Sequence, residues 1–277
     1  MGRAYSARPF FLPVRLAGME HENAFDIVAF AAGLRTAAIG HRVVYRASVG
    51  STMDLAREEA ARGAPHGTLV LAEEQTAGRG RRGRGFYSPA GENLYFTLVL
   101  RISADVQPRL PVAVPLAVCL ALRDEGLDAL IKWPNDIWVG ERKLCGMLID
   151  AETGKHGVIA YPGIGINVNG DPTLIPELRD SATSLRRELG QEIAREPLLA
   201  RICNGLEDAL AADGEALVER YRALSMLVGR PVTVTPGQGD AFEAVAEGID
   251  ASGALLVLRA DGSQESVLAA DVSVRPS

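Results

Sequence analysis

The sequence predicts an α+β protein that ends in a small β-barrel. Four short apolar segments joined by tight turns follow one another over residues 129–169, a pattern that predicts hairpins in a mixed sheet. After Met226 the chain consists of short alternating segments separated by Gly, Asp and Ser, as in a small barrel. We therefore expect an N-terminal extension over 1–40, a main domain over 41–224 and a C-terminal domain over 225–277.

The first elements of the chain are expected to be helix, strand and helix. The Ala-rich stretch near 24–38 suits a helix, and "HRVVYRAS" (41–48) suits a short strand. The segment "STMDLAREEAARG" (51–63) predicts a helix, because Ser51 and Asp54 resemble a capping box and glycine follows the last turn. The turn from strand to helix therefore falls at residues 50–52.

An unusual loop follows between two predicted strands, 67–75 and 93–101. "GRGRRGR" (78–84) gathers four arginines and three glycines in a chain whose formal net charge is -6. Glycines let backbone N–H groups approach a ligand, and guanidinium groups match carboxylate and phosphate oxygens. The loop therefore suits a closely held anion, although a solvated basic turn has the same composition.

The remaining elements of the main domain are two helices and the hairpins. "PRLPVAVPLAVCLALRDEG" (108–126) predicts a buried helix with proline in its early turns, packed on the sheet. Strands are expected to end at Lys132, Val139, Ile149 and near Asn167. A stripe of apolar residues at helical spacing predicts one more helix over 196–224.

Composition argues against several classes of protein. The apolar run 110–122 contains two prolines and is shorter than the roughly 20 residues that cross a bilayer. The N-terminus has no apolar core followed by a cleavage site, so we expect a cytoplasmic protein without a secretory signal. Cys119, Cys145 and Cys203 are odd in number and lie in apolar stretches, which predicts buried free thiols.

The motif "KWPND" (132–136) places a lysine at the end of an apolar strand. Pro134 fixes the turn that follows, so the Lys132 ammonium points either to solvent or into a site at the strand end. In such a site it could neutralise a carboxylate and a phosphate while they react. A surface lysine followed by a structural turn is the alternative.

Two further motifs suggest close packing around a ligand. In "GERKLCGMLID" (140–150), which also carries Lys143, Gly146 inside a strand predicts the close approach of another group. In "GIGINVN" (163–169), Asn167 and Asn169 project to one side because they are two residues apart. Each motif alone also fits an ordinary core.

Together and in this order, "STMD", "EEQTAGRGRRGRGFYSPAGENLYFTLVL", "KWPNDIWVGERKLCGMLID" and "GIGINVN" closely resemble the biotin protein ligase family over about 43–224. The resemblance implies a mixed-sheet catalytic domain, class II synthetase-like and of the biotin/lipoate ligase type, followed by an SH3-like barrel. It implies that biotin and ATP, with Mg²⁺, form biotinyl-5'-adenylate and pyrophosphate. Biotin then passes to one lysine of the biotin carboxyl carrier domain of a carboxylase, such as acetyl-CoA carboxylase.

The resemblance also implies roles for individual residues. Lys132, which would bridge carboxylate and α-phosphate, and Arg81 are the implied catalytic residues. Residues 171–189 are a candidate lid over the nucleotide, and no protein side chain is assigned to the metal. The implied biotin site is Ser51, Thr52, Met53, Gln75, Arg79, Gly80, Arg81 and Lys132. The implied adenylate site is Gly78, Arg79, Gly80, Arg81, Arg82, Gly83, Arg84, Asn135, Lys143 and Asn167.

Two other classes of protein share some of these features. A lipoate or octanoate ligase shares the architecture and the adenylate chemistry, but the loop and "KWPND" are typical of the biotin branch. A nucleic-acid-binding regulatory module would use "RGRRGR", yet one basic loop in an acidic chain is a local feature. The first 40 residues lack a winged helix, so DNA is not an expected partner; a homodimer is left open.

Overall fold

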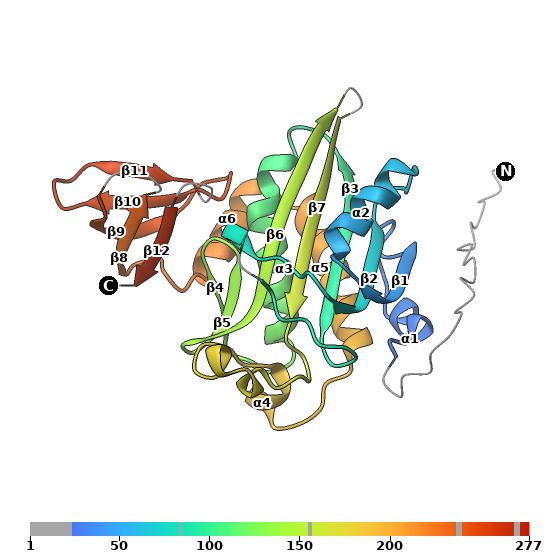
Figure 1. Cartoon of the computed structure of the whole chain (residues 1–277). Coiled ribbons are helices and arrows are strands. Elements are labelled where there is room, and N and C mark those ends of the chain that lie inside the picture. Colours follow the sequence, from blue (N-terminus) through green and yellow to red (C-terminus); the bar gives the residue numbers. More distant parts are fainter. Residues whose placement is uncertain (1–23, 84, 155–156, 237–239, 269–271, 277) are drawn as a thin grey trace.

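The computed structural model describes residues 24–83, 85–154, 157–236, 240–268 and 272–276. Figure 1 shows a large sheet with helices on both faces and a smaller sheet at the C-terminal end of the chain. The predicted α+β class, with a mixed sheet and a small C-terminal antiparallel sheet, is confirmed. Within these ranges, no helix combines the length and the apolar character that a membrane span requires.

The large sheet has seven strands in the order β1-β2-β3-β7-β6-β5-β4. β1 and β2 are parallel, and every other neighbouring pair is antiparallel, so the sheet is mixed as predicted. The predicted hairpins are the pairs β4–β5, β5–β6 and β6–β7. The strands are β1 (Val43–Val49), β2 (Thr68–Gln75), β3 (Leu94–Ile102), β4 (Ala129–Lys132), β5 (Asp136–Val139), β6 (Arg142–Gly154) and β7 (Gly157–Ile166).

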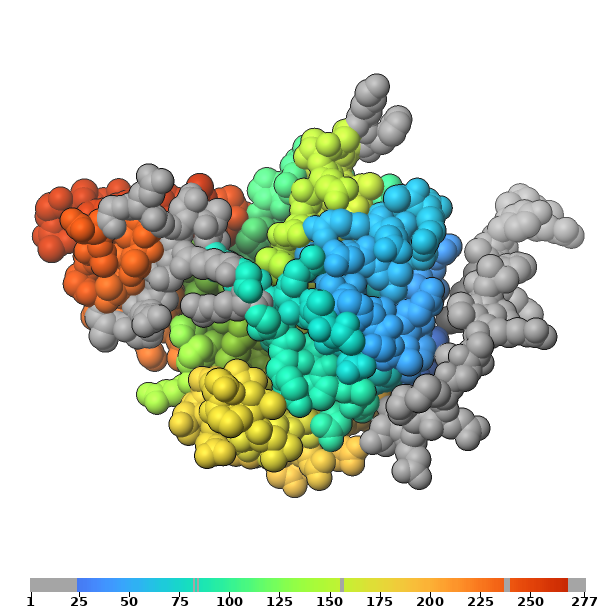
Figure 2. Space-filling model, viewed as in Figure 1, coloured from blue at the N-terminus to red at the C-terminus, as the bar shows by residue number. Residues whose placement is uncertain are grey.

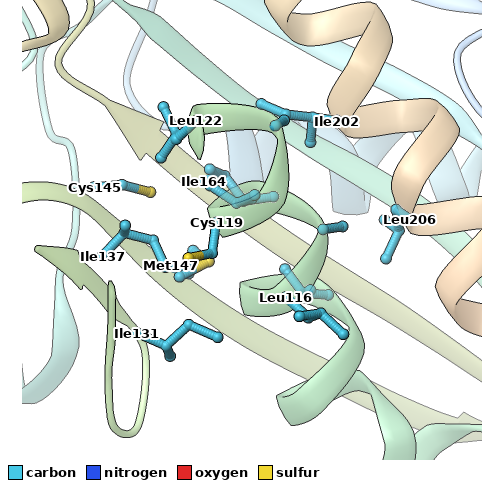
Figure 3. Packing of buried hydrophobic residues seen from close by; sticks show 14 of the residues in the cluster. Leu116, Cys119, Leu122, Ile131, Ile137, Cys145, Met147, Ile164, Ile202 and Leu206 are labelled. Atoms are coloured by element: carbon cyan, nitrogen blue, oxygen red, sulfur yellow. The ribbon is translucent and has the colours of Figure 1, made fainter. Parts of the chain in front are cut away.

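The main core lies between this sheet and α3 (Leu110–Arg123), whose second face packs on α5 (Arg195–Ala211). α3 is apolar almost all round, as a helix buried on both sides must be. The three cysteines are free and buried as predicted, and burial raises the pKa of Cys119 to about 12. Figure 3 shows the packing of Leu116, Cys119 and Leu122 on Ile131, Ile137, Cys145, Met147 and Ile164, with Ile202 and Leu206 beyond.

Two N-terminal helices differ in how well the sequence predicted them. α2 (Thr52–Ala61) begins at the predicted cap, where Ser51 Oγ accepts from the Met53 N–H at 3.3 Å. α1 (Ile27–Ala32) is much shorter than predicted. The chain leaves the helix at Gly33, where a Cβ would lie 2.9 Å from Ala200 of α5, and then packs along that helix. Side chains of α5 accept hydrogen bonds from the backbone N–H groups of residues 35, 38 and 39. These N–H groups therefore have partners without a longer helix.

The predicted single helix over 196–224 is wrong, because the structure divides it. α5 ends at Ala211, and α6 (Gly214–Ala223) begins after a new cap. The Asp213 carboxylate accepts from the N–H groups of Glu215 and Ala216 at 2.9 and 3.2 Å. An aspartate followed by glycine is therefore a start signal here, which the apolar stripe concealed.

The C-terminal sheet has five antiparallel strands in the order β11-β10-β9-β8-β12. It is joined to the large sheet by the segment 224–226, which pairs with Ile131 on the outer edge of β4. The Trp133 indole also donates to the carbonyl of Gly253 at 2.9 Å. The strands are β8 (Pro231–Pro236), β9 (Phe242–Ile249), β10 (Leu255–Arg259), β11 (Gln264–Val267) and β12 (Val272–Pro276).

Short helices complete the described chain. The helix α4 and two of the 3₁₀ helices lie between β7 and α5, which is the segment predicted as a lid. Their bounds are η1 (Arg81–Gly83), η2 (Gln107–Arg109), η3 (Pro172–Leu174), η4 (Pro176–Leu178) and α4 (Leu185–Leu189).

Candidate functional site

A cavity of about 410 Å³ lies over β6 and β7, on the face of the sheet away from α3. In Figure 2 the segment between β2 and β3 (teal) lies across the front of the molecule, between α2 (blue) and the segment 170–190 (yellow). The lining comes from five parts of the chain that are far apart in sequence. It comprises Ser51, Thr52, Met53, Gln75, Arg79, Gly80, Arg81, Gly85, Phe86, Lys132, Trp133, Pro134, Asn135, Asp136, Lys143, Gly146, Met147, Leu148, Gly163, Ile164 and Gly165.

Glycines form the floor of this cavity. Gly146 pairs with Gly165 across β6 and β7, and Gly163 lies two residues away on the same face. A Cβ on Gly165 would lie 2.5 Å from the Phe86 ring, and one on Gly163 would lie 2.8 Å from the Met53 side chain. The predicted close approach at Gly146 is confirmed, since its Cβ would lie 2.9 Å from Lys143 Nζ.

The turn from β1 to α2 forms one wall, where polar groups are held in fixed positions. The Gln75 side-chain oxygen accepts from the Thr52 N–H at 2.9 Å and from the Thr52 hydroxyl at 3.1 Å. The Gln75 amide nitrogen donates to Ser88 Oγ at 3.2 Å, and Thr97 donates to the Thr52 hydroxyl at 2.9 Å. Met53 is 4% exposed and fills the space above Gly163.

The Gly/Arg loop supplies two cations to the cavity. Arg79 donates to the Asp54 carboxylate, and Arg81 Nη1 donates to Asn135 Oδ1 at 3.3 Å. The expectation that Asp54 serves a capping box is thus not met, because its carboxylate pairs with this loop arginine. Gly78 and Gly83 lie outside the lining; a Cβ on Gly78 would meet the Phe86 carbonyl at 2.6 Å. The Arg82 side chain and Arg84 lie outside the described residues.

The motif over 132–136 contributes the opposite wall. Lys132 ends β4 as predicted, and its Nζ lies 3.4 Å from the centroid of the Trp138 ring. Asn135 donates to the Met147 carbonyl, which fixes the turn onto β6. Lys143 Nζ lies 2.7 Å from Asp136 Oδ1, so the second lysine of the lining is already paired with a carboxylate.

A second cavity of about 130 Å³ lies beside the first and shares Gly85, Phe86 and Lys143 with it. Asn167 lines this second cavity and not the first, and its side chain donates to the Thr183 carbonyl at 2.9 Å. Asn169 lines neither of these two cavities and instead exchanges two hydrogen bonds with Ile193. Both asparagines therefore fasten the segment that follows β7.

Sequence reasoning missed several lining residues. Phe86 follows the Gly/Arg loop and stands above the glycine floor, and the spacing of Gly163 and Gly165 on one face was the signal that pointed to such a partner. Asp136 was predicted only as part of a turn. Trp138 is outside the cavity lining but contacts Lys132; it gave no signal, because this contact depends on the register of the β4–β5 hairpin.

The charges of the lining favour an anionic ligand. Arg79, Arg81, Lys132 and Lys143 face the cavity, and Asp136 is the carboxylate among its described lining residues. Over the described part of the chain, no three His, Cys, Asp or Glu side chains are grouped so as to hold a metal ion. Cations that are fixed beside polar groups can neutralise carboxylate and phosphate groups brought together in one pocket.

Known proteins resemble this chain over most of its length. The model of the biotin/lipoate A/B protein ligase family matches residues 45–169, and that of the biotin protein ligase C terminal domain matches 227–275. The bifunctional ligase/repressor BirA of Bacillus subtilis is 33% identical over 251 residues, which cover 87% of this chain and 77% of the relative. The biotin–[acetyl-CoA-carboxylase] ligase of Paracoccus denitrificans is 35% identical over 216 residues, covering 73% and 88%.

Solved structures agree with the sequence matches. The biotin protein ligase of Aquifex aeolicus in complex with biotin and ATP superposes with a TM-score of 0.72 at 27% identity, covering 85% of this chain and 99% of that one. The fold is thus that of a protein ligase that acts on a small acid. The chain belongs to the biotin/lipoate A/B protein ligase family, within its biotin protein ligase branch.

Proposed function

We propose that this chain is an ATP-dependent biotin protein ligase that activates biotin in the 410 Å³ cavity and transfers it to a lysine of a biotin carboxyl carrier domain. The observation that carries the proposal is the convergence of Arg79, Arg81 and Lys132 over a glycine floor in a chain of this family. Relatives named biotin–[acetyl-CoA-carboxylase] ligases support the carrier domain as acceptor.

The first step joins two anions. A carboxylate oxygen of biotin attacks the α-phosphorus of ATP, the bond to the bridging oxygen breaks, and pyrophosphate leaves. Lys132 would bridge the carboxylate and the α-phosphate, while Arg79 and Arg81 offset the charge on the remaining oxygens. Lys132 and Arg81 are the residues we propose as catalytic, since the barrier is largely one of charge repulsion and orientation.

The wall at the β1–α2 turn is proposed to orient the biotin ring. Ser51, Thr52 and Gln75 offer hydroxyl and amide groups whose positions are fixed by mutual hydrogen bonds. Such preorganised polar groups select one orientation of a small ligand at little entropic cost. Met53 contributes apolar surface over Gly163, and Gly80 lets the loop backbone approach the ligand.

The nucleotide is proposed to extend toward the second cavity. That cavity shares Lys143 with the first and is lined by Asn167 and by part of the segment 171–189, which would cover the base. Mg²⁺ would arrive with ATP, held mainly by phosphate oxygens and water; Asp136, the carboxylate among the described lining residues, is already paired with Lys143. Residues 78–84 would close over the phosphates.

The second step needs access for a protein partner. The neutral amine of the acceptor lysine attacks the carbonyl carbon of the mixed anhydride, and the bond from that carbon to the bridging phosphate oxygen breaks. AMP leaves with that oxygen, and the nitrogen releases a proton as the amide forms. In the described sheet the edge strands are β1 and β4, and the segment 224–226 already pairs with β4. We therefore propose β1 as the edge on which the acceptor docks.

Mass spectrometry of a carrier domain incubated with this protein, biotin and Mg-ATP tests the proposal. We expect one added biotinyl group per acceptor. Lys132→Ala should slow the reaction by about 10²–10³-fold, as the loss of a charge-stabilising donor does in other enzymes, and Arg81→Gly should slow it less. Arg62→Ala removes an arginine at the far end of α2 and serves as the control. Pyrophosphate exchange driven by lipoate and not by biotin would contradict the proposal.

A further inference from the structure

The ammonium of Lys132 lies over the ring of Trp138. β4 and β5 are antiparallel, with Lys132 opposite Asp136 and Leu130 opposite Trp138. Lys132 and Trp138 are therefore diagonal neighbours on one face of the hairpin, a spacing that long and aromatic side chains can bridge. The Lys132 Nζ lies 3.4 Å from the ring centroid, within the range of a cation–π contact.

The carboxylate directly opposite Lys132 is engaged elsewhere. Asp136 Oδ1 lies 2.7 Å from the Nζ of Lys143, which reaches it from β6. A carboxylate would neutralise the cation that it holds, whereas an aromatic face attracts a cation through its quadrupole and carries no net charge. The contact with the indole therefore leaves the net charge of the ammonium unchanged.

Trp138 is not held in place by its own polar group. Its Nε1 is buried and has no hydrogen-bond partner among the described residues, although a buried indole N–H usually finds one. The ring face, and not the N–H, makes the contact with Lys132, which lines the cavity.

We propose that Trp138 is a positioning residue for adenylation, which holds the Lys132 ammonium at the cavity through the indole face. Trp138 acts through Lys132, so this inference rests on the proposed function. Without the ring, the four-carbon side chain samples more rotamers, and the ammonium spends less time between carboxylate and phosphate.

Two substitutions separate this role from simple packing. Trp138→Leu keeps apolar bulk and removes the ring face, whereas Trp138→Tyr keeps an aromatic face. In biotin-dependent pyrophosphate exchange we expect Trp138→Leu to lower kcat by about 2- to 30-fold, the range that corresponds to a cation–π contact of about 0.5–2 kcal/mol. The KM for biotin should change less than about twofold, and Trp138→Tyr should recover most of the loss.

Fluorescence gives a readout that does not depend on turnover. The chain has two tryptophans, so Trp133→Phe leaves Trp138 as the sole indole. In this background, Lys132→Met removes the cation with little change in side-chain length and should shift the emission maximum of Trp138. Arg62→Met, which removes a distant cation, should leave the spectrum unchanged.

The outcomes distinguish this inference from the proposed function. Absence of biotin-dependent exchange in the unmodified protein would overturn the function. Two results would overturn the positioning role while the unmodified protein shows exchange. In the first, Trp138→Leu catalyses exchange as fast as the unmodified protein. In the second, the Leu and Tyr variants are equally slow and are equally destabilised in thermal unfolding. If the Leu variant fails to fold, the emission test decides: a spectrum that Lys132→Met leaves unchanged refutes the contact.

Discussion

Gly165→Ala should weaken biotin binding through a contact that the structure defines. The added Cβ would lie 2.5 Å from Phe86 Cε1 and 2.8 Å from Cζ, closer than carbon atoms approach one another. The φ angle at this position is compatible with alanine in a strand, so the ring and not the backbone must yield. The ring can move only at the expense of the cavity that it lines, and overpacking of this kind costs about 1–3 kcal/mol.

Isothermal titration calorimetry with biotin measures this effect. When the displaced ring occupies space that the ligand needs, the overpacking free energy of about 1–3 kcal/mol corresponds to a dissociation constant for biotin about 5- to 150-fold higher. Gly154→Ala is the matched control, because its Cβ would meet nothing within 4 Å at the end of the same hairpin. Phe86→Leu in the Gly165→Ala background should restore part of the affinity. Unchanged affinity in Gly165→Ala, with unchanged thermal stability, would refute the role assigned to the floor.

Three further predictions concern stability, measured by thermal or denaturant unfolding. Burial alone would raise the pKa of Glu207, but hydrogen bonds from backbone N–H groups lower it. The stabilisation by this carboxylate should therefore be present above about pH 4.5 and be lost as the pH falls below that value. Glu207→Gln should be about 1–2 kcal/mol less stable at pH 7, and its stability should fall less steeply at acid pH. Arg195→Met removes the cation that pairs with the buried Glu73 carboxylate and should lower the free energy of unfolding by about 3–5 kcal/mol. The loss should be smaller when Glu73→Gln accompanies it. Gly253→Ala forces a φ of +80° on alanine beside the hydrogen bond from Trp133 and should lower the free energy of unfolding by about 1–3 kcal/mol. For each of these three single variants, a loss of stability below about 0.5 kcal/mol would contradict the stated cause.

The sequence was sufficient where local chemistry decides the structure. The cap at Ser51 and the strand end at Lys132 lie where turn and cap residues indicated, because those signals act over a few residues. The break at Asp213 was missed, although its signal is equally local, because the apolar stripe continues across it. The short α1 could not be predicted, since its end is set by side chains of a helix about 170 residues later.

The candidate site was predictable in its motifs and not in its contacts. Arg79, Arg81, Lys132 and the polar groups of the β1–α2 turn do line one cavity, but their partners come from other strands. The pairing of Asp54 with Arg79 and the stacking of Lys132 on a ring depend on loop path and strand register. Those are tertiary quantities that no spacing in the sequence specifies.

The register of β6 on β7 couples the core to the cavity. Cys145 pairs with Ile166 and Met147 with Ile164, and these side chains pack beneath α3, whereas the alternate pair of Gly146 and Gly165 faces the cavity. Because side chains alternate along a strand, a slip of one residue would place glycines in the core and bulky side chains in the ligand site. Selection for a stable core at this hairpin therefore also preserves the glycine floor, and a substitution that shifts the register should abolish ligand binding and stability together.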